Sequence, residues 1–110
     1  MKGTNLGEFE ELVLLTVGIL HDEAYSIAIA NEIKKVTKRD VSFAVVHSAL
    51  NRLEEKGYVD SKLGGATTDR GGRSKRLVSI SVAGKKALLR SKAQRDELWS
   101  MIPKVVFKNI

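Results

Sequence analysis

The stretch "SFAVVHSALNRLEEKG", residues 42–57, decides the fold because it combines a helix start, an apolar stripe and a helix stop. Ser42 is a favoured N-cap residue, and Gly57 suits the left-handed position that often follows a helix. Apolar side chains at helical spacing predict one buried face, made of Val46, Leu50 and Leu53 with Phe43 or Ala49 beside them. The opposite face is small or polar and carries no acid before residue 54.

A helix with a small, acid-poor outer face fits the major groove of DNA, which is about 12 Å wide. We therefore expect this face to lie in the groove, with Asn51 and Arg52 best suited to hydrogen-bond bases or nearby phosphates. The residues expected to face the groove are Ser42, Ala44, Val45, His47, Ser48, Asn51 and Arg52.

Segments 58–63 and 75–81 alternate apolar and polar residues, which predicts two short strands. The stretch between them, "GGATTDRGGRSKR" at 64–76, is then the glycine-rich, basic tip of a hairpin, whose backbone can approach phosphates while its cations neutralise them. The residues expected to hold the DNA backbone or minor groove are Lys62, Arg70, Arg73, Lys75 and Arg76. The alternative is an ordinary solvated turn, and Asp69 has no assigned role.

Two further helices are predicted before this region. Residues 6–21 place three glutamates in the first turns, where the helix dipole favours them, and are apolar on nearly every side in the second half. Such a helix is either the central core helix or meets a partner. Residues 25–38 carry an apolar stripe of Ile29, Ile33 and Val36.

A last helix begins at Val82 and is kinked or ended by Pro103. We therefore expect one domain over residues 1–110, mainly α with a small β-hairpin: a winged helix-turn-helix core at 6–81 and a C-terminal dimerisation helix at 82–108. The apolar residues of the first and last helices both need to be buried, and a dimer with two-fold symmetry would bury them. The residues expected at this dimer interface are Leu12, Leu15, Ile19, Leu98, Trp99, Ile102 and Val105.

The charge of the chain is concentrated locally. The net charge is +6, but residues 66–95 alone hold nine Lys or Arg and one acid, and a field of one sign is what a phosphate backbone selects. There is no cysteine, and the longest apolar run, residues 12–20, is about half of what a bilayer crossing needs. The N-terminus does not read as a signal peptide, so we expect a cytoplasmic protein.

Catalytic and metal sites have no support in the sequence. His47 is accompanied only by His21, with no cluster at ligand spacing, and no serine has a visible base and acid. Adjacent glutamates such as Glu54 and Glu55 do not share a helix face, so they do not form a paired-carboxylate site. We expect no enzyme activity, no cofactor and no metal.

Three segments resemble the PadR-like family of transcriptional regulators. "LGEFEELVLLTVGIL" resembles its opening helix, "VSFAVVHSALNRLEEKGYV" its recognition segment, and "GGRSKRLVSISVAGKKAL" its passage from hairpin to last helix. His47 stands where the family usually has tyrosine. The resemblance implies a homodimeric winged-helix protein that binds double-stranded DNA, usually a repressor, with the first and last helices building the dimer.

The sequence thus predicts a sequence-specific DNA-binding regulator that acts as a homodimer on a palindromic operator. The resemblance also allows a small aromatic effector beside Trp99 at the dimer interface, although a lone tryptophan more often serves only in packing. The alternative function is a winged-helix protein-interaction module whose basic hairpin meets an acidic partner.

Overall fold

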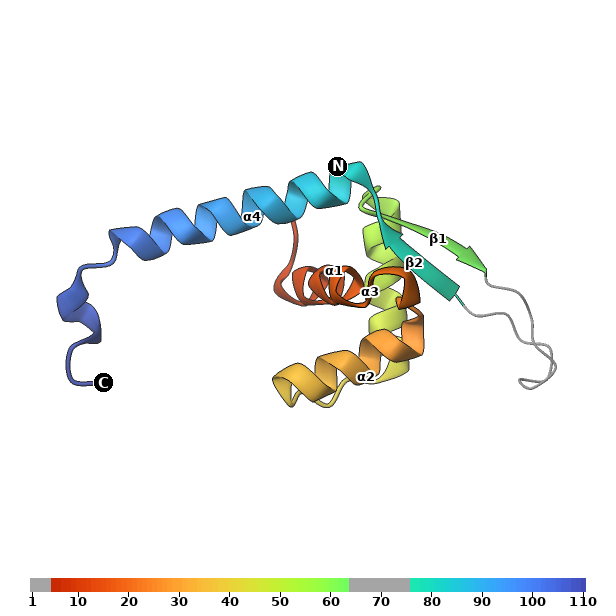
Figure 1. The fold of residues 1–110 in the computed structure, drawn as a ribbon, viewed down its shortest axis with the longest axis horizontal. Coiled ribbons are helices and arrows are strands. Elements are labelled where there is room, and N and C mark those ends of the chain that lie inside the picture. The colour runs from red at the N-terminus through yellow and green to blue at the C-terminus, as the bar shows by residue number, and fades with distance from the viewer. Residues whose placement is uncertain (1–4, 64–75) are drawn as a thin grey trace.

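The structure is a computed structural model that describes residues 5–63 and 76–110 (Figure 1). The elements in these ranges are α1 (Glu8–Leu20), the 3-10 turn η1 (His21–Glu23), α2 (Ser26–Thr37), α3 (Phe43–Glu55), β1 (Val59–Leu63), β2 (Arg76–Ile80), α4 (Val82–Met101) and the 3-10 turn η3 (Lys104–Phe107). The predicted helices and strands are confirmed, with ends that differ by at most two residues except in the last helix, which ends at Met101 and not at residue 108. A mainly helical chain with one small hairpin in this order is consistent with a winged-helix layout.

The first three helices pack around a common core, to which each contributes side chains one helical turn apart. The apolar side chains of these helices that are at most 1% exposed are Val13, Leu14 and Val17 of α1, Ile29 and Ile33 of α2, and Val46, Ala49, Leu50 and Leu53 of α3. One prediction about this core is wrong: Val36 is 61% exposed because it follows the last covered residue of α2. Of the two residues expected beside the stripe of α3, Ala49 is buried, whereas Phe43 is 51% exposed because it precedes the first covered residue of the helix.

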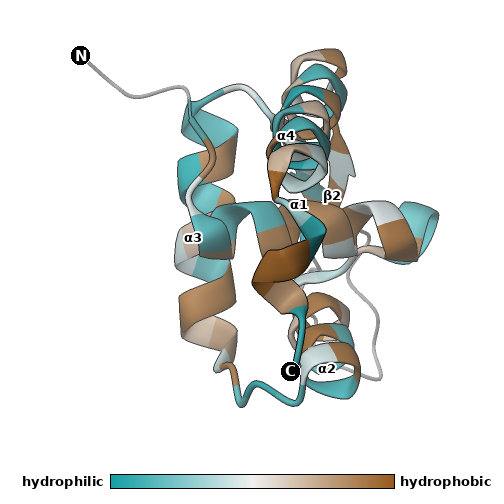
Figure 2. Cartoon of the chain, turned by 90° about the vertical axis from the view of Figure 1, so that its left-hand side faces the viewer, coloured by the Kyte–Doolittle hydropathy of each residue, from teal (hydrophilic) through white to brown (hydrophobic). Residues whose placement is uncertain are grey.

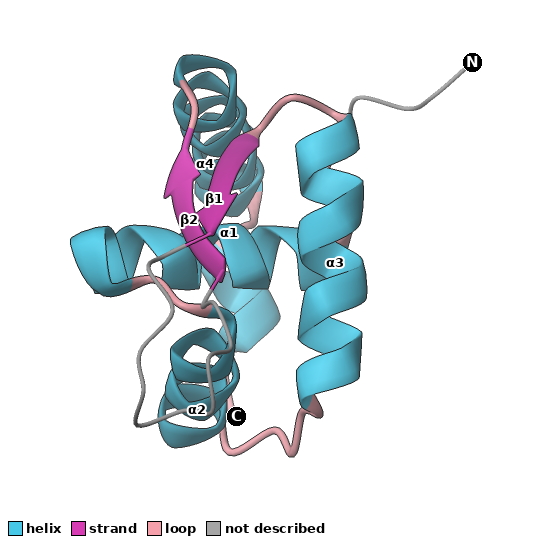
Figure 3. Cartoon of the chain, turned by 90° about the vertical axis from the view of Figure 1, so that its right-hand side faces the viewer, coloured by secondary structure: helices cyan, strands magenta, loops and turns pink. Residues whose placement is uncertain are grey.

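The hairpin lies beside α3 (Figure 3). β1 and β2 pair antiparallel along their whole lengths, so alternate residues share a face. Val59 and Val78, each 1% exposed, are buried in the core, whereas Lys62 and Ser79 are exposed. The backbone N–H of Val78 also donates to the carbonyl of Ala24 at 3.0 Å, which ties β2 to the segment before α2.

The end of α3 and the start of α4 meet in a close junction, which we call the α3–α4 joint (Gly57, Tyr58, Ser81 and Gly84). Gly57 has a φ of +78°, as predicted for the residue after the helix. Ser81 caps α4 by accepting the N–H of Gly84 at 3.0 Å, and its hydroxyl donates to the carbonyl of Gly57. The N–H of Ser81 donates to the carbonyl of Tyr58 at 3.0 Å, so the joint leaves little room around Gly84.

α4 leaves the core soon after it begins. Among its residues only Gly84 and Ala87 are buried. The guanidinium of Arg95 donates to Glu11 at 3.0 Å and fastens the middle of α4 to α1. The helix then extends past α1, and the molecule measures 59 Å along its longest axis (Figure 1). Figure 2, viewed from that end, shows the apolar residues of the C-terminal segment in brown.

In the two described ranges, no helix has both the length and the apolar content that a membrane crossing requires.

Replacing Gly84 by alanine tests the α3–α4 joint. A Cβ at this position would lie 2.1 Å from the carbonyl oxygen of Tyr58, so the backbone must shift. We expect Gly84→Ala to lower the free energy of unfolding by about 1–3 kcal/mol, the usual cost of overpacking, in thermal or urea unfolding.

Gly18→Ala is the matched control. Gly18 is exposed in α1, and its Cβ would meet only the end of the Ile80 side chain at 3.4 Å. Because alanine is the better helix former, this variant should be unchanged or up to about 1 kcal/mol more stable. A Gly84→Ala protein as stable as the wild type would contradict the close approach at the joint.

Candidate nucleic-acid interface

α3 begins with the predicted cap and presents most of the predicted groove-facing residues to solvent. The hydroxyl of Ser42 accepts the N–H of Val45 at 3.2 Å, which satisfies one of the free donors at the helix start. The exposed members of the predicted set are Ser42, Ala44, Val45, Ser48, Asn51 and Arg52. His47 is half-buried.

Arg76, at the start of β2, makes the contacts that join the hairpin to α3. Its side chain is only 13% exposed. Nε donates to the hydroxyl of Ser61 at 3.0 Å, Nη1 donates to Oδ1 of Asn51 at 2.9 Å, and Nη2 donates to Glu54 at 3.1 Å. Nη1 also lies 3.3 Å from Nδ1 of His47. The guanidinium thus bridges both strands and three residues of α3.

These contacts change the roles of two predicted residues. Arg76 was expected to hold the DNA backbone or minor groove, but its Nε, Nη1 and Nη2 donate within the protein and hold the hairpin against α3. Asn51 was expected to hydrogen-bond bases or nearby phosphates, but its Oδ1 already accepts from Arg76. Hydrogen bonds from Ser61 and Arg76 lower the pKa of Glu54, which favours the charged carboxylate that this cluster needs.

Arg52 is also engaged within the protein. Its Nε donates to Glu10 of α1 at 3.0 Å, and Lys56, one turn later in sequence, donates to the same carboxylate at 2.6 Å. The N–H of Gly7 completes the site at 3.0 Å. Burial would raise the pKa of Glu10, but the hydrogen bonds from Lys56, Gly7 and Arg52 together lower it. Arg52 therefore reaches toward α1 and supports α3 from the side.

Phe43, one of two residues that the sequence pattern offered for the core, is a surface residue. Its ring is stacked on that of His47, with centroids 5.6 Å apart and planes 23° apart. Phe43 is 51% exposed and Val45 is 49% exposed, so the first turn of α3 presents apolar side chains to solvent. The signal available in the sequence was position, because the first turn of a helix often lies outside the core that its middle covers.

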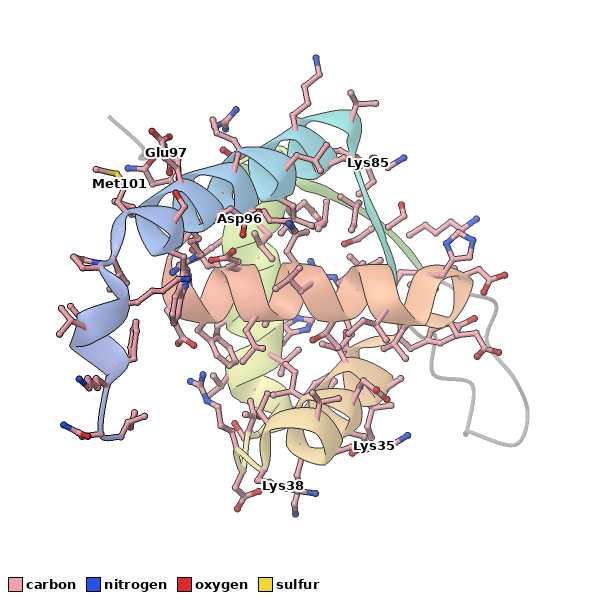
Figure 4. The ribbon with its side chains drawn as sticks, turned by 60° about the vertical axis from the view of Figure 1, so that its left-hand side comes forward. Lys35, Lys38, Lys85, Asp96, Glu97 and Met101 are labelled. Atoms are coloured by element: carbon pink, nitrogen blue, oxygen red, sulfur yellow. The ribbon has the colours of Figure 1, made fainter. Side chains whose placement is uncertain are left out.

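The cations at the hairpin tip lie partly outside the structure. Lys62 of β1 is exposed, whereas Arg70, Arg73 and Lys75 lie outside the described residues. Two exposed lysines that were not predicted, Lys35 and Lys38, lie at the end of α2 just before the turn that leads into α3 (Figure 4). The polar turn at residues 37–40 that follows α2 is the sequence feature that could have identified them.

The basic stretch 66–95 does not form one surface in the described residues. Arg95 is paired with Glu11 at 3.0 Å, and Lys92 with Asp96 at 2.7 Å. Lys85, at the start of α4, lies on the opposite side of α1 from Lys35 and Lys38 (Figure 4). The sequence count of nearby charges therefore overstated the field that α4 adds to the α3 side.

The predicted dimer residues are mostly exposed, with two exceptions. Exposed fractions are 46% for Leu15, 61% for Ile19, 65% for Leu98, 64% for Trp99 and 70% for Val105. Ile102 is half-buried, and Leu12 is half-buried because it packs against the core of its own chain. The ring of Trp99 stacks on Phe107 with centroids 5.7 Å apart. The apolar surface at the end of α4 is therefore built by both α4 and η3.

A cavity of about 430 Å³ lies between the N-terminal segment and α4. Leu6, Ala87 and Leu98 supply apolar lining, and Arg90 and Arg95 supply cationic lining. Trp99 is not among its lining residues, so this cavity is distinct from the effector position that the sequence suggested.

No model of a known protein family matches the chain, and no curated protein matches it. Within residues 5–63 and 76–110, no group of three His, Cys, Asp or Glu side chains is placed to hold a metal ion.

Arg76→Met should loosen the hairpin from α3, because it keeps the aliphatic stem and removes every hydrogen bond. We expect a loss of about 1–2 kcal/mol in unfolding free energy. Amide hydrogen exchange should rise more in β1 and β2 than in α1. Arg76→Lys should recover little of this lost stability, since a lysine cannot reproduce the planar fork of donors. Lys62→Met, on the exposed face of the same hairpin, is the control, and equal effects of the two methionine variants would refute the role of Arg76.

Glu10→Gln should flatten the acid limb of the stability curve. The pKa of Glu10 lies below its ordinary value of 4.5 when the protein is folded, so its contribution is complete above that value and is lost as the pH falls through the lowered pKa. At neutral pH the variant should be about 1–3 kcal/mol less stable, because Lys56 and Arg52 lose a charged acceptor. Urea unfolding between pH 7 and pH 3 measures both effects.

Glu97→Gln, a change at an exposed carboxylate near the end of α4, is the control for this pH series. It should leave the acid limb unchanged. If Glu10→Gln and the wild type lose stability in parallel as the pH falls, the buried carboxylate is not the source of the acid sensitivity.

Proposed function

We propose that the chain is a sequence-specific DNA-binding transcriptional regulator, of the PadR-like kind that its sequence resembles, acting as a homodimeric repressor on a palindromic operator. The observation that carries the proposal is the exposed, acid-free first half of α3, which lies beside a hairpin joined to it by Arg76. A protruding helix and an adjacent basic hairpin are the two parts with which winged helices contact DNA.

The dimensions and charge of α3 support this use. Its 13 residues give a length of about 20 Å, and an α-helix fits a major groove about 12 Å wide. No Asp or Glu occurs between residues 41 and 53, so phosphates flanking the groove would meet no acidic side chain of this segment. Ser48 and Ala44 add little bulk on the exposed side.

Cations around α3 are suited to contact the phosphate backbone. Lys35 and Lys38 are exposed before α3, and Lys62 is exposed on the hairpin. In the sequence, Arg70, Arg73 and Lys75 follow in the tip between the strands. Contacts of this kind give affinity and register, while base edges give specificity.

The proposed homodimer is supported by the exposed apolar surface of α4. Leu98 and Trp99 are about two-thirds exposed on a helix that extends past its own core, which is costly in water. Leu15 and Ile19 of α1 add further exposed apolar side chains. A two-fold dimer would cover these surfaces and present two α3 helices to the DNA.

A protein-interaction module is the second candidate, and the half-exposed Phe43 and Val45 favour it because apolar surface is common at protein interfaces. The two functions differ in whether any duplex is bound, and whether affinity depends on sequence at physiological salt.

Selection of bound duplexes from a random pool at fixed salt tests the proposal. We expect recovery of a palindrome with half-site centres about 34 Å apart, or one helical turn. On the recovered duplex, Lys62→Ala should weaken binding and reduce the slope of log K against log salt by about two, as expected for one lost phosphate contact in each of the two protomers.

Lys108→Ala is the control for the salt series, because Lys108 is exposed just after η3, at the opposite end of the molecule from the hairpin (Figure 1). It should leave the slope unchanged. Failure to recover any enriched duplex would overturn the proposed function, and a non-palindromic product would overturn the dimer.

A further inference from the structure

The first turn of α3 exposes three apolar residues, which we call the apolar head (Phe43, Ala44 and Val45). Phe43 is 51% exposed, Val45 is 49% exposed, and Ala44 is exposed between them. The first turn is the part of such a helix that penetrates a major groove most deeply. Apolar side chains at this position cannot form hydrogen bonds with base edges.

Three of the polar residues that could read bases from α3, Asn51, Arg52 and His47, already make contacts within the protein, whereas Ser48 is exposed. Arg52 donates to Glu10 on the side of α1. Asn51 accepts from Arg76 through Oδ1, the atom that a bidentate contact with adenine would also require. His47 lies between Phe43 and Arg76, with one ring face covered by the stacking partner. The hydrogen-bonding capacity of α3 is therefore directed largely toward its own fold.

Phe43 is held in place although it is exposed. Its ring stacks on His47, and His47 in turn lies 3.3 Å from the guanidinium of Arg76. Arg76 is 13% exposed and is hydrogen-bonded to both the hairpin and α3. A chain of contacts thus fixes the phenyl ring relative to the hairpin, so little side-chain freedom remains to be lost when a ligand binds.

We propose that α3 reads its DNA site mainly through the 5-methyl groups of thymine, which the apolar head contacts in the major groove. This inference rests on the proposed function. Thymine carries the apolar group on the major-groove edge, and alanine and phenylalanine are side chains that contact it. The recovered half-site therefore contains thymine where the first turn of α3 lies.

Replacing thymines of the selected duplex one at a time by deoxyuridine tests this inference, because uracil pairs identically and lacks only the methyl group. At one or two positions in each half-site, the wild-type protein should lose affinity about three- to fivefold per methyl group. At the remaining thymines, the substitution should have little effect.

The protein variants assign that sensitivity to residues. For at least one of the sensitive positions, Phe43→Ala or Val45→Ala should bind the duplex with thymine there and the duplex with uracil there with nearly equal affinity. Both residues are about half exposed, so the variants should fold, which thermal unfolding checks. Ile27→Ala removes an apolar side chain of α2 that is 56% exposed and should keep the full sensitivity to uracil.

The outcomes separate the inference from the function on which it rests. If no duplex is enriched, the proposed function fails and thymine reading fails with it, as expected if the apolar head docks a protein. If a duplex is bound and every uracil substitution is tolerated, the function stands and the inference is overturned. Sensitivity that persists unchanged in both Phe43→Ala and Val45→Ala also overturns it.

Discussion

Residues from two distant parts of the chain, α3 and β2, are joined by the guanidinium of Arg76. A hairpin of two short strands has little stability by itself, so its position must come from contacts with the rest of the fold. The core contacts of Val59 and Val78 fix its base. Arg76 fixes its side, because the planar fork of donors reaches a strand hydroxyl, an amide and a carboxylate at once. The angle between α3 and the hairpin, on which the proposed DNA contact depends, follows from this set of bonds.

Local periodicity in the sequence was enough to predict the helices, the strands and most of the core. Ile29, Ile33, Val46 and Leu50 are buried as expected, since each helix must cover one stripe. The exceptions lie at helix ends. Periodicity indicates which way a side chain points, but it does not indicate where the neighbouring element stops.

The roles of the charged residues could not be predicted in the same way. Arg52 is 42 positions from Glu10, and Arg76 is 22 positions from Glu54, so each pair exists only after folding. The sequence pattern treated both arginines as available to contact DNA. Ala44 and Ser48, which are exposed as expected, are small residues. Sequence alone therefore located the surface well, but it did not identify which donors on that surface were available.

The α3–α4 joint fixes one end of the long helix α4, so a small tilt at that end produces a large displacement at the other. The Ser81 hydroxyl donates to the carbonyl of Gly57 and accepts the N–H of Gly84, and Gly84 closely approaches Tyr58, so the start of α4 has little freedom to move. Since α4 has 20 residues and is about 30 Å long, a tilt of about 5° about its start would displace its far end by roughly 2–3 Å. In the other direction, a force applied at Trp99, near the far end of α4, would exert a large torque on the α3–α4 joint, which follows the end of α3. The orientation of α3 and the position of Trp99 and Phe107 are therefore coupled through the α3–α4 joint.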